Sequence, residues 1–126
     1  MKLNALMVVN AIVAGLFGIG FVLVPAQLLS QYGITTDAQF EMVGQLFGAA
    51  LIGFAVLTWA ARNATDSDAR RAILLGIFVC NAIGFVVALI GQLGGVANTL
   101  GWSTVAIYLL LALGFGYFRF AKQAAA

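Results

Sequence analysis

The stretch LNALMVVNAIVAGLFGIGFVLV, residues 3–24, decides the fold. It holds no charged residue, and as an α-helix rising about 1.5 Å per residue it is long enough to cross about 30 Å of hydrocarbon. Pro25 follows directly and disfavours continuation of a helix. We therefore predict a first transmembrane helix over residues 3–24. A cleaved signal peptide is the alternative, but the apolar cores of such peptides are usually only about 7–15 residues long.

The composition extends this prediction to the whole chain. Of its 126 residues 63% are hydrophobic and 8% are charged, whereas about a quarter of the residues in a soluble domain are charged. Apolar stretches over residues 38–61, 70–91 and 98–120 predict three more spans. The expected fold class is all-α, a four-helix transmembrane bundle forming one integral membrane domain over residues 1–126. A short interfacial helical segment should follow the first span, and the lipid bilayer is the main partner.

The basic residues predict the orientation of this bundle. With four spans, all six fall on the same side of the membrane: Lys2, Arg62, Arg70, Arg71, Arg119 and Lys122. Because such residues favour the cytoplasmic side, we expect both termini in the cytoplasm and a bacterial inner membrane as the location. The net charge of +2 lacks the dense basic stripe of a nucleic-acid-binding protein, so no nucleic-acid partner is expected.

Capping signals predict where the later helices begin. Thr36 opens the stretch TDAQ, which has the form of a capping box for the second span. The Thr and Asp residues of segment 63–68 are good caps for the third span, and Asn98 or Thr99 should start the fourth.

Several classes of chemistry are disfavoured by what the sequence lacks. It contains no histidine and one cysteine, Cys80, so haem ligation and CxxC redox chemistry are not expected. Its four acids are too scattered for a metal cage, and no glycine-rich nucleotide loop occurs. We predict no catalytic residue, metal, cofactor or nucleotide, and no enzymatic activity.

Polar residues inside the spans are the candidate functional residues. A carboxamide facing lipid leaves its hydrogen-bonding groups unsatisfied, so Asn10, Gln45 and Asn81 should face the bundle interior. The favoured interpretation is that they bond across helices, and the alternative is a polar path for a ligand. Glu41, one turn before Gln45, is either an acid in a first helical turn or a proton- or cation-sensitive group at the outer mouth of such a path. Between the helix ends, the polar residues of the spans are Asn10, Gln45, Thr58, Cys80, Asn81 and Tyr108.

Glycines inside the spans predict close helix packing. Gly44 and Gly48 form a strict GxxxG motif, and looser small-xxx-small pairs include Gly15, Gly18 and Gly84. Packing within one chain is the favoured interpretation. A homodimer or higher oligomer formed through one such face is the alternative.

Two asparagines share a local context. The segments VNAI around Asn10 and CNAI around Asn81 lie at comparable depths in the first and third spans. A parallel duplication would produce this pattern. Chance in so biased a composition is an equally good explanation.

Longer segments resemble a known group of proteins. The stretches LFGAALIGFAVLTWAARN (46–63) and LGWSTVAIYLLLALGFGYF (100–118), with Pro25 and the QYG of 31–33, are similar to small bacterial four-span proteins grouped as DoxX-like. The resemblance implies the four-span layout and assigns no catalytic residue.

The expected function is that of a non-enzymatic multi-pass membrane protein, either a structural or accessory subunit or a binder of an apolar ligand. The alternative is a small channel or transporter, oligomeric or part of a larger membrane complex, with a polar path past Asn10, Gln45 and Asn81.

Overall fold

A computed structural model describes residues 2–121, and all regular structure in this range is helical. Four helices in it are long and apolar enough to cross a membrane: Leu3–Leu23, Ala38–Ala61, Asp68–Leu93 and Gly101–Ala121. The predicted all-α class with four spanning helices is thereby confirmed. Lys122, one of the six cations used to predict the orientation, lies outside the described residues.

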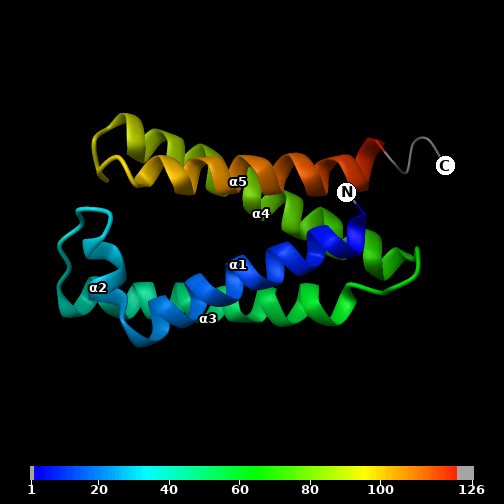
Figure 1. Cartoon of the computed structure of the whole chain (residues 1–126), viewed down its shortest axis with the longest axis horizontal. Helices are drawn as coiled ribbons and strands as arrows, with labels where there is room; N and C mark the ends of the chain where they lie inside the picture. Colours follow the sequence, from blue (N-terminus) through cyan, green and yellow to red (C-terminus); the bar gives the residue numbers. More distant parts are fainter. Residues whose placement is uncertain (1, 122–126) are drawn as a thin grey trace. The chain divides into compact units, whose positions relative to one another are not determined.

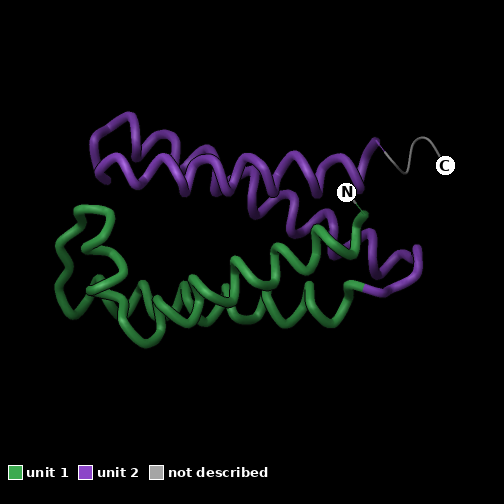
Figure 2. Tube along the Cα trace, in the orientation of Figure 1, with its two compact units in different colours: residues 1–62 green, residues 63–126 purple. Residues whose placement is uncertain are grey.

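The chain divides into two compact units, residues 1–62 and residues 63–126, which Figure 2 colours separately. Each is a helix pair. Each unit has its own small core of apolar side chains, and many large apolar side chains elsewhere stay exposed, for example Leu16, Leu23 and Leu93 at about 70%. Side chains of this kind can remain exposed because the surrounding solvent is lipid.

Unit 1 is an antiparallel pair made of α1 (Leu3–Leu23) and α3 (Ala38–Ala61), which pack along their lengths (Figure 1). The short helix α2 (Pro25–Ser30) connects them and confirms the helical segment expected after the first span. Pro25 occupies its first turn, where a missing backbone N–H costs nothing. Gly33 then turns the chain with a φ of 74°, a conformation that favours glycine.

Unit 2 pairs α4 (Asp68–Leu93) with α5 (Gly101–Gly116), and the five residues Tyr117–Ala121 continue α5 as a π-helical turn (Figure 1). The ring of Phe120 on this turn lies edge-on to that of Phe78 in α4, with centroids 5.3 Å apart. This π-helical turn is therefore packed against the first half of α4, although its backbone departs from α-helical winding.

The helix starts differ in detail from the capping predictions. Thr36 was predicted to cap the second span, but Asp37 does so, accepting a hydrogen bond from Phe40 N at 2.8 Å. The carboxylate of Asp37 lies one residue nearer the free N–H groups, which explains the difference. Ser67, rather than a Thr or Asp residue, caps α4 by accepting from Arg70 N.

The start of the fourth span was also predicted too early. The helix α5 begins at Gly101, because Asn98 forms a separate turn in which its backbone oxygen accepts from Gly101 N and its side chain from Leu100 N. An asparagine side chain that bonds two residues ahead favours such a turn over a helix start.

Candidate functional site

Asn10 and Thr58 form a buried polar contact between the two helices of unit 1. The Asn10 side chain is 4% exposed and the Thr58 side chain is fully buried. Asn10 Nδ2 donates to Thr58 Oγ1 over 3.3 Å, and the Thr58 hydroxyl donates to Phe54 O in its own helix over 2.8 Å. The threonine thus links an amide of α1 to the backbone of α3, which keeps both groups satisfied away from water.

The functional prediction did not include Thr58, although it appears among the intramembrane polar residues. A threonine in a helix can bond the carbonyl of its own preceding turn, so its presence alone does not demand a partner in another helix. The signal that could have identified it is its place in the last turns of the second span, at the same depth as Asn10 in the first.

Gln45 connects the opposite ends of the same helices. Its Nε2 donates to Val22 O over 3.1 Å, but its side chain is exposed, so the expectation that it faces the bundle interior is wrong for this residue. The last carbonyls of a helix lack intrahelical partners, and Val22 lies in the last turn of α1. Gln45 therefore caps the end of α1 from α3.

Glu41 lies one turn before Gln45, at the start of α3. Its Oε1 accepts a hydrogen bond from the Thr36 hydroxyl over 2.7 Å, and the residue is half-buried. An acid in the first turn of a helix is stabilised by the helix dipole. This geometry matches that of an acid at a helix start.

Asn81, in unit 2, is bonded differently. It is 6% exposed, and its Nδ2 donates to Ile77 O of its own helix over 2.8 Å. Within residues 2–121 its carboxamide makes no hydrogen bond to α5. Its bonding therefore does nothing to join the helices of its unit.

The structure does not gather the predicted polar residues into one site. In unit 1, Asn10 meets α3 at Thr58. At about 1.5 Å per residue, Gln45 lies about 20 Å and Glu41 about 25 Å from Thr58 along that helix. Asn81 belongs to the other unit. Each polar group is tied to a local partner.

Four of the five glycines predicted to pack helices lie in unit 1, at the contact between α1 and α3. A Cβ built on Gly48 would lie 2.7 Å from Gly18 O, and one on Gly18 would lie 2.9 Å from Gly48 O. Gly15 faces Ala55 of α3 at 3.6 Å, and Gly44 faces Phe21 of α1 at the same distance. The GxxxG face is thus occupied by another helix of the same chain.

The fifth, Gly84, lies in unit 2. A Cβ on it would overlap the ring of Tyr108, with Cζ at 2.8 Å.

Among the described residues, no group of three or more His, Cys, Asp or Glu side chains could hold a metal ion.

These features define a multi-pass α-helical membrane protein. Its four long helices are apolar, their polar side chains have local partners, and the charges lie near the helix ends. A family model described as a domain of unknown function (DUF8292) matches residues 1–118, so the chain belongs to that family. No curated protein and no solved structure matches it.

Proposed function

We propose that this protein is a non-enzymatic structural or accessory component of a bacterial inner membrane. The proposal rests on the hydrogen bonds that the intramembrane carboxamides of unit 1 donate between α1 and α3. Asn10 and Gln45 each donate across the α1–α3 contact, to Thr58 Oγ1 and to Val22 O. Amides engaged in this way stabilise a helix pair, and each has a donor committed to a protein partner rather than to a solute.

The proposed orientation has both termini in the cytoplasm. In each unit the basic residues gather at one end of the helix pair: Lys2 and Arg62 in unit 1, and Arg70, Arg71 and Arg119 in unit 2. The positive-inside tendency supports a cytoplasmic location for these ends. A reporter fused after Ala126 that is active only in the periplasm would contradict it.

An accessory role also fits the outer surface of α3. Large apolar side chains on this helix are more than half exposed: Met42, Val43, Leu46 and Val56. Such a surface suits lipid, an apolar ligand or the spanning helix of a larger complex equally well. The DoxX-like resemblance supports this proposal only through the shared four-span layout.

The second candidate is a small channel or transporter, and one observation favours it. Asn81 is buried in a spanning helix without a hydrogen bond to the helix beside it in unit 2. Buried polar groups of this kind commonly mark substrate or ion pathways.

Flux into proteoliposomes distinguishes the two candidates. Full-length wild type, Asn10→Leu and Asn81→Leu are reconstituted separately and tested against a panel of ions and small polar solutes. The accessory role predicts that wild type behaves as protein-free liposomes do. Flux through wild type that falls in Asn81→Leu would overturn it and support transport.

A further inference from the structure

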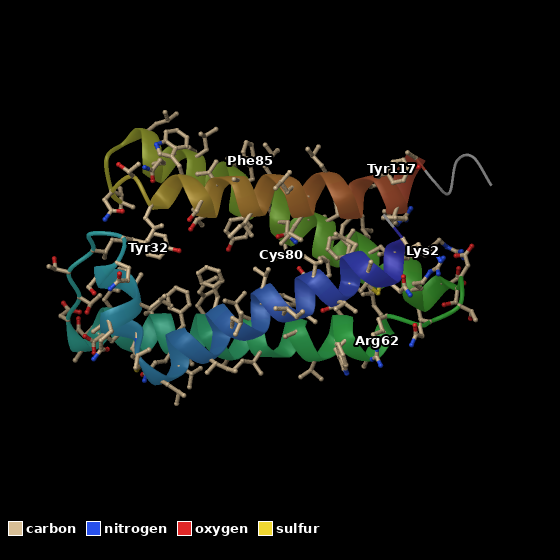
Figure 3. All side chains as sticks on the ribbon, viewed as in Figure 1. Lys2, Tyr32, Arg62, Cys80, Phe85 and Tyr117 are labelled. Carbon is tan, nitrogen blue, oxygen red and sulfur yellow. The ribbon has the colours of Figure 1, made fainter. Side chains whose placement is uncertain are left out.

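One end of unit 1 carries positive charge without a matching acid. Lys2 immediately precedes α1 and Arg62 immediately follows α3, so the antiparallel pairing brings both to the same end (Figure 3). The two acids of this unit, Asp37 and Glu41, lie at the start of α3, which is the opposite end. Within residues 2–121, neither cation forms an ion pair.

The arginines at the start of unit 2 are in a different situation. Arg71 pairs with both Asp66 and Asp68, and Arg70 pairs with Asp66 over 3.5 Å while donating to Ala64 O. Two acids thus offset two cations within one short segment. Of these four cations, Lys2 and Arg62 therefore have the charges more available to an outside anion.

The side chain of Arg62 is held in a defined position. Its guanidinium carbon lies 4.0 Å from the centre of the Trp59 ring, and its Nη1 donates to Trp59 O over 2.6 Å. A guanidinium has five N–H donors, and stacking uses only its face, so most of the in-plane donors stay available. Trp59 is 50% exposed, and tryptophan at the end of a spanning helix favours the headgroup level of a bilayer.

We propose that Lys2, Trp59 and Arg62 form a binding site for the headgroup phosphate of an anionic phospholipid. The planar fork of an arginine matches two phosphate oxygens, and the lysine adds a second positive charge at the same end of the unit. The tryptophan fixes the guanidinium before the lipid arrives, which reduces the ordering needed on binding. The site selects lipid by charge, so phosphatidylglycerol binds and phosphatidylcholine does not compete.

Native mass spectrometry of the full-length protein in detergent tests this site. Phosphatidylglycerol and phosphatidylcholine are titrated in parallel, and the lipid-bound fraction is measured. Each basic residue near an anionic lipid surface raises affinity about fivefold, so Lys2→Gln combined with Arg62→Gln should weaken phosphatidylglycerol binding about twenty-five-fold. The matched control, Arg71→Gln, removes a cation that is already paired and should leave binding within about twofold of wild type.

A conservative variant guards against loss of folding in the double variant. Arg62→Lys keeps the charge and removes the stacked fork, so its affinity should lie between those of wild type and the double variant. Equal binding of the two lipids by wild type would overturn the proposal, as would an unchanged affinity in the double variant or in Arg62→Lys. An equal loss in Arg71→Gln would show general charge attraction, and displacement by millimolar inorganic phosphate would show a site for free anions; both contradict a lipid site.

Discussion

Unit 1 and unit 2 are both antiparallel helix pairs with a buried asparagine in their first helix, yet different groups make the closest contacts. In unit 1 backbone approaches backbone, because Gly18 and Gly48 each lie against the carbonyl oxygen of the other. In unit 2 an aromatic side chain fills the space over a glycine, as Tyr108 does over Gly84. A backbone carbonyl cannot move aside without shifting its helix, whereas a ring can rotate, so the two contacts should differ in their tolerance of substitution.

The two units also differ in whether their side-chain hydrogen bonds join one helix to the other. Side chains of unit 1 bond across its helices, from Asn10 to Thr58 and from Gln45 to Val22 O. In unit 2, Asn81 bonds within its own helix, and Gln92 Nε2 donates to Asn98 O in the connecting turn. The two asparagines with similar sequence contexts therefore have different structural roles, although both are buried.

The largest effect is expected from Gly48→Leu. The new side chain would begin 2.7 Å from Gly18 O and 2.8 Å from Phe21 Cβ, so α1 must move away from α3. We expect a loss of about 3 kcal/mol or more in the free energy of unfolding, measured by circular dichroism during titration of mixed micelles with dodecyl sulfate.

The matched control lies in the same helix. A Cβ on Gly53 would have no atom of the described residues within 4 Å. Gly53→Leu therefore has the same side chain and the same gain in helix propensity without the clash. Equal destabilisation by the two substitutions would contradict the packing assigned to Gly48.

Gly84→Ala in unit 2 should lower the free energy of unfolding by a smaller amount, and a second substitution should compensate for the loss. The added methyl group overlaps the ring of Tyr108, and moving the ring should cost about 1–2 kcal/mol in the same unfolding assay. Combining Gly84→Ala with Tyr108→Leu should show a favourable coupling energy, because the smaller side chain leaves room. Gly76→Ala, at a position with open space, is the control. A coupling energy of zero would show that the ring does not set the contact.

The smallest effects are expected at the two asparagines. Asn10→Leu removes an interhelical hydrogen bond and should destabilise the protein by about 0.6–1 kcal/mol. Asn81→Leu removes only a bond within its own helix, so its effect should lie within about 0.5 kcal/mol of zero. A double-mutant cycle of Asn10→Leu with Thr58→Val isolates the contact, and a coupling energy near zero would remove the distinction between the units.

Much of the fold could be predicted from the sequence because the spans are set by composition. The second span was expected over residues 38–61 and α3 covers the same range, while α4 extends two residues beyond the expected span at each end. Those extra residues include Asp68, a polar residue that hydropathy alone places in the loop. Ser67 caps the helix one residue earlier and so brings Asp68 into its first turn.

The partners of the polar residues could not be predicted, for a physical reason. A helix in lipid is apolar on all sides, so no hydrophobic stripe indicates which face meets another helix. The pairing of Asn10 with Thr58 depends on that face. The sequence also does not predict the hydrogen bond from Asn81 to Ile77 O, because a carboxamide can bond either a neighbouring helix or its own preceding turn. The π-helical turn after Gly116 has no sequence signal that we recognise.

The central claim is that the small residues of α1 and α3 pack against each other within one chain, and a disulfide tests it most directly. A Cβ on Gly15 would lie 3.6 Å from Ala55 Cβ, within the range of disulfide-bonded cysteines. In a Cys80→Ser background, Gly15→Cys with Ala55→Cys should oxidise in intact membranes to a cross-linked monomer, whereas Gly15→Cys with Gly53→Cys should not. A cross-linked dimer, or no cross-link in the first pair, would contradict the account.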